Sequence, residues 1–278
     1  MGVNVYQMVT DRIIEQLNNG VVPWVKPWTG VRTGAFNRIT KKPYSLINQM
    51  LLKHSGEYAS FKQWSELGGT IRKGEKSEIV VFWKIQEIEN INEDGEPIKR
   101  AIPLLRYYNV FHISQVDGVQ PLAEPFADVE PITDADTIII DYVTREQINF
   151  KEKASDRAFY SPTSDSVVVP MKEQYAHINE YYSTTFHELI HSTGHKNRLD
   201  RLEHGQVAAF GSDVYSKEEL VAEIGSASIL NILGIETMKT FQNSASYIQS
   251  WLTVLKNDNK FIVSSASKAE KAVEYILG

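Results

Sequence analysis

Cysteine is absent from the 278 residues. This absence suits a reducing compartment and limits the side chains that can bind a metal. Without thiols the chain forms no disulfide and offers no thiolate to a metal, so a metal site must use histidine and carboxylate ligands. No apolar run approaches the roughly 20 residues that cross a bilayer, and residues 1–10 lack a basic stretch followed by an apolar core. We therefore expect a globular cytoplasmic protein with no membrane partner.

Positive charge is concentrated in the first third of the chain. Residues 1–84 contain 12 Lys and Arg against 6 Asp and Glu, a balance of +6, whereas residues 85–278 contain 17 against 29, a balance of −12. A basic segment joined to an acidic one is typical of proteins that couple nucleic-acid binding to a second activity. Uneven solvation of an ordinary surface would give the same split, so charge alone does not decide between the two.

A proline-bearing acidic stretch separates two parts of the chain. Residues 120–134 carry Pro121, Pro125 and Pro131 among acidic side chains, a composition that suits an extended connection. We place a domain boundary there, with one domain over residues 1–125 and a second over residues 126–278. The length of the chain also fits two domains of ordinary size.

The first part combines helical and strand patterns. Apolar residues at intervals of four predict an amphipathic helix over residues 5–18. Ser60 and Gln63 have the spacing of a capping box and predict a short helix that ends before Gly68. Residues 70–84 predict two strands about a turn at 73–76, the polar residues 85–100 a loop or exposed hairpin tip, and residues 104–113 a further strand. The first domain is therefore expected to be mixed α/β.

Helices dominate the second part. A helix is predicted over residues 134–146, followed by short strands at 148–151, 158–161 and 166–169. Further helices are predicted over residues 178–193, 216–233, 240–256 and 266–277. The whole chain is thus expected to be α+β, with a mainly helical second domain.

A metal-binding motif lies in the first of these later helices. His187 and His191 are four residues apart, so both imidazoles leave the same helix face about one turn apart and can reach one ion. Glu188 flanks the first histidine, where it can take a proton from metal-bound water without ligating the metal. This register predicts zinc as the cofactor and a hydrolase, most simply a peptidase, as the function. Two histidines on an ordinary surface helix are the simpler alternative.

Zinc requires a third protein ligand, and two schemes are available. The motif begins like one in which a third histidine follows Gly194 after two residues, but Asn197 occupies that position. His195 follows Gly194 directly and is expected to form local hydrogen bonds or to support a ligand. The other scheme uses Glu219 as the ligand and Glu223, one turn later, as the acceptor that orients a ligand histidine. Two solvated glutamates on an exposed face are the alternative.

Aromatic and basic residues are interleaved in the first part, as in proteins that stack bases and track the phosphates of single-stranded DNA. Tryptophans of a small domain also commonly form its core, and composition does not separate the two interpretations. The candidate DNA-binding residues are Trp24, Lys26, Trp28, Arg38, Lys62, Trp64, Arg72, Lys73 and Lys76.

Motifs in both parts resemble those of ArdC-type antirestriction proteins. In the first part the resemblance lies in Pro23-Trp24, Pro27-Trp28, Asn37-Arg38, Pro43-Tyr44, Phe61-Lys62-Gln63-Trp64, Arg72 to Lys76 and Val81 to Lys84. In the second part it lies in Tyr160-Ser161-Pro162, Asp165, Tyr181-Tyr182, His187 to His195, Arg198-Leu199 and Glu218 to Glu223. These motifs follow the family's order over nearly the whole chain.

The resemblance implies a domain that binds single-stranded DNA, joined to a zincin-like metallopeptidase domain. It also implies carriage on mobile genetic elements, where such proteins protect incoming DNA from restriction. Two functions remain open: a zinc peptidase brought by DNA to its target, for which a host protein is the candidate, or a DNA-binding shield whose zinc site is structural or vestigial. The intact Glu188 favours the peptidase, because a structural site needs no general base.

Overall fold

The computed structural model describes residues 4–25, 34–91, 97–122, 135–202, 213–235 and 245–278, and it confirms the α+β class. The predicted first helix is present as α1 (Val5–Asn18). It begins at Asn4, whose side chain accepts a hydrogen bond from the Gln7 backbone amide. Its apolar face, which includes Val9 and Ile13, is buried.

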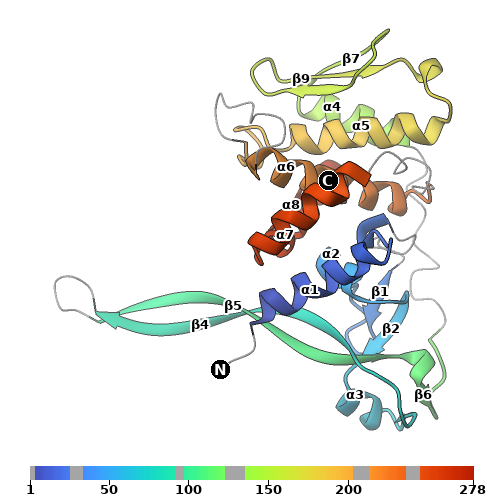
Figure 1. Cartoon of the computed structure of the whole chain (residues 1–278), viewed down its shortest axis with the longest axis vertical. Helices are drawn as coiled ribbons and strands as arrows, with labels where there is room; N and C mark the ends of the chain where they lie inside the picture. The colour runs from blue at the N-terminus through green and yellow to red at the C-terminus, as the bar shows by residue number, and fades with distance from the viewer. Residues whose placement is uncertain (1–3, 26–33, 92–96, 123–134, 203–212, 236–244) are drawn as a thin grey trace.

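A four-stranded sheet organises the N-terminal half. It has the order β1 (Ala35–Asn37), β2 (Gly56–Ala59), β5 (Pro97–His112), β4 (Glu78–Ile91), and the short helix α2 (Leu46–Leu51) lies between β1 and β2 in the chain. Strands β4 and β5 pair antiparallel along their whole length and form a hairpin that extends well beyond the rest of the sheet (Figure 1). Most of residues 85–100 therefore belong to the two strands of a hairpin, so the hairpin alternative predicted for this segment agrees with the structure and the loop alternative is wrong.

Smaller elements complete this half. Helix α3 (Phe61–Glu66) carries the predicted capping box between Ser60 and Gln63. Strands β3 (Thr70–Ile71) and β6 (Val116–Asp117) form a separate pair. Two short 3-10 helices, η1 (Pro23–Val25) and η2 (Ile113–Gln115), lie before β1 and after β5.

The C-terminal half contains a three-stranded sheet and five helices among the residues described. Helix α4 (Ala135–Arg145) precedes β7 (Asn149–Lys153), β8 (Phe159–Ser161), β9 (Ser166–Pro170) and the 3-10 helix η3 (Lys172–Gln174). The sheet order is β7-β9-β8, with β7 parallel and β8 antiparallel to β9. The three predicted strands are confirmed.

Four helices follow, namely α5 (Ile178–Ser192), α6 (Asp213–Ile232), α7 (Ala245–Asn257) and α8 (Phe261–Leu277). Figure 1 shows α5 beside the small sheet and α6 between α5 and α8. Helix α8 begins at Phe261 rather than at residue 266 as predicted, and residues 240–244 of the predicted third helix lie outside the described ranges. In the described part of the chain, no helix combines the length and the apolar character needed to cross a membrane.

The two halves share one hydrophobic core. The rings of Trp24 and Trp251 meet edge to face at 5.3 Å, and both side chains are buried. The Thr10 hydroxyl on α1 donates to the Asn259 carbonyl at 2.9 Å, just before α8. The predicted boundary between residues 125 and 126 falls outside the described residues and remains a prediction.

Candidate metal centre

Helix α5 presents both motif histidines on one face. His187 and His191 lie one turn apart, and their Nε2 atoms approach to 3.1 Å. Apolar neighbours such as Phe186, Leu189 and Ile190 are fully buried on the other side of the helix and fix its rotation against the core. The two imidazoles therefore converge because the opposite face of α5 is packed.

Helix α6 brings Glu219 to the same point. One Glu219 carboxylate oxygen lies 3.4 Å from His187 Nε2, and the other lies 3.4 Å from His191 Nε2. One potential ligand atom from each residue lies within 4.8 Å of the others. Three atoms bound to one zinc ion at about 2.0–2.1 Å in tetrahedral geometry are roughly 3.3 Å apart. The observed spacings fit that geometry, so these residues could hold a divalent metal ion.

The outward nitrogen of each histidine faces a further carboxylate of α6. Glu223 lies 3.7 Å from His187 Nδ1, and Glu218 lies 3.4 Å from His191 Nδ1. Carboxylates in this position orient the imidazole and leave its other nitrogen free for the metal. Glu223 thus lies where the sequence predicts it, whereas the sequence analysis missed Glu218.

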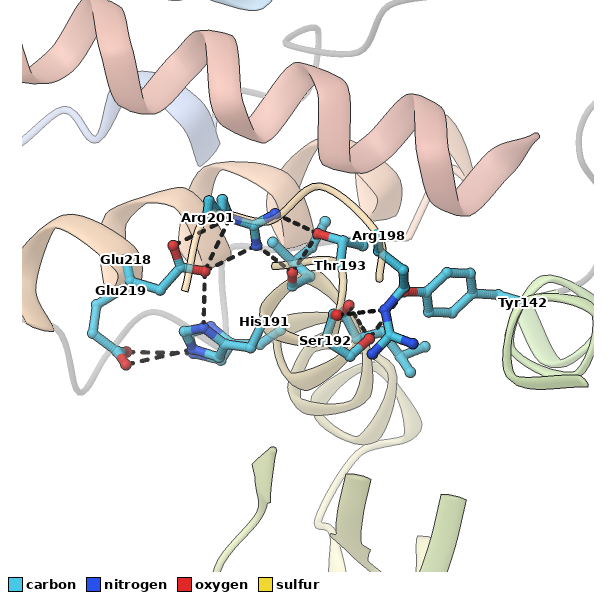
Figure 2. Close-up of polar contacts among 11 residues, drawn as sticks. Tyr142, His191, Ser192, Thr193, Arg198, Arg201, Glu218 and Glu219 are labelled. Atoms are coloured by element: carbon cyan, nitrogen blue, oxygen red, sulfur yellow. Dashed lines mark hydrogen bonds and ion pairs between the residues drawn. The ribbon is translucent and has the colours of Figure 1, made fainter. Parts of the chain in front are cut away.

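Arg201 fixes Glu218 in turn (Figure 2). Its Nη2 donates to Glu218 at 2.9 Å, and its Nε lies 3.1 and 3.2 Å from the two carboxylate oxygens. The same guanidinium donates to the Thr193 hydroxyl at 2.6 Å and to the Ile190 carbonyl at 2.5 Å. The C-terminal end of α5 and the start of α6 are therefore joined through one nearly buried arginine beside the candidate metal centre.

A second arginine anchors the end of α5 to the small sheet. Arg198 donates from Nε to the Ser192 carbonyl at 2.7 Å and from Nη1 to Asp165 at 3.1 Å. The Ser192 hydroxyl lies 3.0 Å from the Tyr142 hydroxyl on α4 (Figure 2). Asp165, in the turn between β8 and β9, has a positive φ of 43°. Asp165 and Arg198 therefore have a structural role, which is to hold the C-terminal end of α5 against the small sheet.

The electrostatics of these side chains favour protonated histidines beside an ionised glutamate. Burial lowers the pKa of His187 and His191, but hydrogen bonds to Glu219 outweigh it for His187, and those to Glu218 and Glu219 raise the pKa of His191 to about 10. Burial raises the pKa of Glu219, yet both histidines bring it far below its usual range. Because a ligating histidine must be neutral, metal binding at neutral pH displaces protons here.

Two further predicted residues lie close to this group in sequence. Glu188 follows His187 on α5, is partly exposed, and its charge contributes to raising the pKa of both histidines. His195 lies in the turn after α5, where its Nδ1 accepts a hydrogen bond from the Asn197 amide at 3.3 Å. The structure confirms local hydrogen bonding for His195. Its predicted contact with a metal ligand is not among the contacts of the described residues.

The structure changes the assignment of the DNA-binding tryptophans. Trp24 is 1% exposed and Trp64 is fully buried, with its indole nitrogen donating to the Phe111 carbonyl at 2.9 Å. A base cannot stack on a ring that is enclosed by protein, so the prediction that these two rings bind DNA is wrong. Lys26 and Trp28 lie outside the described residues.

The predicted basic residues divide into two groups. Arg38 is mostly buried and forms an ion pair with Glu57, and Arg72 pairs with Glu75 and Asp117. Their charges are therefore compensated within the protein. The remaining three basic residues are exposed, namely Lys62, Lys73 and Lys76. Lys62 lies 3.7 Å from Glu66, one turn further along α3.

Comparisons with known proteins agree with this architecture. Residues 3–111 match the family described as the N-terminal domain of anti-restriction factor ArdC, and residues 139–268 match the zincin-like metallopeptidase family. Two crystal structures of the antirestriction ArdC protein of plasmid R388 are similar to the chain. The metal-free form has a TM-score of 0.74 at 34% identity, and the Mn(II)-bound form has a TM-score of 0.76 at 31% identity. Each comparison covers 99% of this chain and 97% of that one.

Curated relatives show the same similarity over the chain's full length. A DNA primase TraC of Escherichia coli is 34% identical over 98% of this chain, which spans only 27% of that relative's length. An uncharacterized protein of Sinorhizobium fredii is 31% identical over 98% of this chain and 91% of its own length. Both halves, their order and the full-length similarity to a solved structure lead to one assignment. The chain belongs to the ArdC-like family of antirestriction proteins.

Proposed function

We propose that this protein protects DNA from restriction by binding single-stranded DNA through its N-terminal half, and that its C-terminal half is a metal-dependent peptidase. The observation that carries the peptidase is the convergence of His187, His191 and Glu219 beside the unused carboxylate of Glu188. A site that only stabilised the fold would have no need for a base next to its ligands.

We assign roles in peptide hydrolysis to the residues around the site. His187, His191 and Glu219 would hold the ion, which when bound supplies a Lewis acid for the scissile carbonyl and acidifies water. Glu188 would take the proton from the attacking water and pass it to the leaving amine. Glu223 and Glu218, beside the outward nitrogens of the two imidazoles, would orient them for the metal.

Zinc is the ion that we assign to this site. Two imidazoles and one carboxylate are a ligand set that zinc peptidases use, and their spacings fit tetrahedral bond lengths. The related ArdC structure that contains Mn(II) shows that the family's fold accommodates another divalent ion. Metal analysis of the protein purified from cells without added metal should find about one zinc per chain. Manganese or no metal in that sample would contradict the assignment.

The DNA-binding role is supported by the basic N-terminal third and by the relatives. One relative is a DNA primase and the solved relatives are antirestriction proteins. Restriction acts on DNA, and a protein that covers a strand keeps a nuclease from it. We place this activity in the cytoplasm, where a host protein is the candidate peptide substrate.

Glu188→Gln tests the peptidase, because the change keeps size and hydrogen bonding but removes the base. Hydrolysis of a quenched fluorescent peptide library, measured with and without an oligodeoxythymidylate, should fall by about a hundredfold or more. Metal content, melting temperature and DNA affinity should stay at the parent's values. Glu180→Gln, on the first turn of the same helix, is the matched control and should hydrolyse the peptides normally.

Antirestriction can be scored in the same variants by transferring unmodified DNA into a restricting host. Equal protection by the parent and Glu188→Gln would assign protection to DNA binding, and proteolysis would then serve another purpose. Loss of protection with intact DNA binding would assign it to proteolysis of a host protein. A parent protein that hydrolyses no peptide, while binding metal fully, would refute the peptidase.

A further inference from the structure

The β4–β5 hairpin has two faces that differ in character. Residues paired across the two strands share a face, and successive residues alternate between faces. One face carries Val81 opposite Tyr107 and Trp83 opposite Leu105. The other face carries Phe82 opposite Arg106. On the same face, Val80 lies opposite Tyr108 and Lys84 lies opposite Leu104.

The first face packs against the core through two of these residues, whereas Trp83 is 49% and Tyr107 is 36% exposed. Val81 and Leu105 are buried in the core cluster that also contains residues of α1 and α2. Further along, the ring of Trp83 lies 6.3 Å from that of Tyr6 on α1, edge to face. The hairpin therefore turns this face towards α1, the helix that it passes in Figure 1.

The second face is open to solvent from Phe82 outward. Phe82 is 42% exposed, and its ring lies 5.6 Å from that of Tyr108, which is partly exposed. Lys84, two residues further along β4, and Arg106, opposite Phe82 on β5, are exposed, and neither forms an ion pair in the described part of the protein. Glu78 is the one acidic residue on this face among those described, and it is buried at the base of the hairpin. The open part of the face is thus aromatic and purely basic.

We propose that this open face, defined by Phe82, Lys84, Arg106 and Tyr108, is the surface that binds single-stranded DNA. The inference rests on the proposed DNA-binding function and gives it a location. Rings exposed beside uncompensated cations allow bases to stack while phosphates are neutralised. Duplex DNA hides its base faces, so the aromatic part of this surface favours a single strand. The face also supplies the exposed rings that Trp24 and Trp64, buried in the core, cannot.

The test compares matched pairs of substitutions in the full-length protein, using fluorescence anisotropy of a labelled oligodeoxythymidylate over a series of salt concentrations. Lys84→Ala/Arg106→Ala should weaken binding about tenfold or more near 0.1 M salt. It should also reduce the slope of log affinity against log salt by about 1.4, because each neutralised phosphate of a single strand contributes about 0.7. Lys268→Ala/Lys271→Ala removes two exposed cations from α8 and should change neither quantity.

Phe82→Ala tests stacking separately from charge. Affinity should fall about 5- to 150-fold with the salt slope unchanged, since one stacked base is lost and no phosphate contact is. Phe82→Tyr keeps the ring and should restore binding to within about twofold. Phe61→Ala, which removes another exposed phenylalanine from α3, is the control.

A measurement on the unaltered protein avoids dependence on the folding of variants. The oligonucleotide should protect Lys84 from acetylation by acetic anhydride and leave Lys268 unprotected, as peptide mass spectrometry would show. Parental affinity in both the paired and the Phe82 variants would overturn the location while leaving the DNA-binding function standing. The location would also be overturned, and the DNA-binding function left standing, if only Lys73→Ala/Lys76→Ala weakened binding or if Phe82→Ala changed only the oligomeric state. An unaltered protein that does not bind the oligonucleotide would overturn both function and location.

Discussion

His191 is held at both ring nitrogens, and this determines which tautomer a metal ion meets. Its Nδ1 faces Glu218, so the proton on that side is directed to a carboxylate and Nε2 is left for the ion. Burial raises the pKa of Glu218, but the hydrogen bond to His191 and the charge of Arg201 bring the net value below its usual range. Glu218 is therefore an ionised acceptor, and Arg201 compensates its charge.

Glu218→Gln should weaken metal binding without removing a ligand. An amide orients the imidazole less strongly than a carboxylate, and loss of such a partner typically costs about 10- to 100-fold in metal affinity. Competition against a chromophoric chelator measures this, and Glu219→Ala, which removes a proposed ligand, should lose far more. Arg201→Lys keeps the charge but not the fork of donors and should give an intermediate loss. Unchanged affinity in Glu218→Gln would show that His191 is oriented by packing alone.

Sequence spacing predicted part of this group and could not predict the rest. Glu219 and Glu223 were found because a four-residue spacing places them on one helix face. Glu218 lies about 100° around the helix from Glu219 and reaches His191 only because α5 crosses beside it. Arg201 comes from the segment after α5, whose path depends on tertiary contacts. The burial of Trp24 and Trp64 likewise depends on which elements cover them, which composition does not reveal.

At the scale of elements, the distance between α5 and α6 determines whether histidines and glutamates meet. Gly225 on α6 lies against Ile190 on α5. A Cβ atom added to Gly225 would lie 2.7 Å from Ile190 Cδ1 and 2.9 Å from Cγ1. Ile190 is fully buried and has little room to move. The absence of a side chain at this position allows the close contact.

Gly225→Ala should therefore separate the two helices. Overpacking costs about 1–3 kcal/mol, which the gain of about 1 kcal/mol in helix propensity offsets only in part. We expect lower stability to urea together with weaker metal binding, because the ligands come from both helices. Ile190→Val removes the Cδ1 atom that lies nearest the added Cβ. The double variant Gly225→Ala/Ile190→Val should therefore lose less stability than the sum of the losses in the two single variants. Additive losses would show that the contact is not limiting.

The hairpin shows why an element can escape sequence analysis. Residues 85–100 are largely polar and lack an apolar alternation, so they predict a loop or an exposed hairpin tip rather than two long strands. The described residues beside this stretch, 82–87 and 101–103, are exposed, and strands without a buried face need no such alternation. Its strands are fixed instead by backbone pairing from Glu78 with Val110 to Ile91 with Pro97.

At the scale of the whole molecule, the N-terminal and C-terminal halves are packed as one body. Trp24 meets Trp251, and the buried face of α1 belongs to the same core cluster as residues of α7 and α8. The α+β class and most elements could be predicted from periodicity and turn residues. This shared core could not, because a domain boundary inferred from composition says nothing about contacts between the halves.

The shared core should make unfolding a single event. Thermal unfolding followed by calorimetry, tryptophan fluorescence and far-ultraviolet circular dichroism should give coincident transitions. Added metal should raise the common melting temperature, since an ion that binds only the folded state stabilises everything that unfolds with it. Two separated transitions, of which only one responds to metal, would show that the halves unfold independently.

The length of the hairpin gives the molecule reach. Fourteen residues of β4 at about 3.3 Å each span roughly 45 Å, a distance comparable to the diameter of a domain. Only Phe111 and His112 of β5 pair with β2, so nearly all of this length is two-stranded, and beyond the buried Val81 and Leu105 it projects as an arm. Figure 1 places the arm on the far side of α1 from α5 and α6. A strand of DNA lying along it would leave the metal centre uncovered, so the protein could hold nucleic acid and admit a polypeptide at the same time.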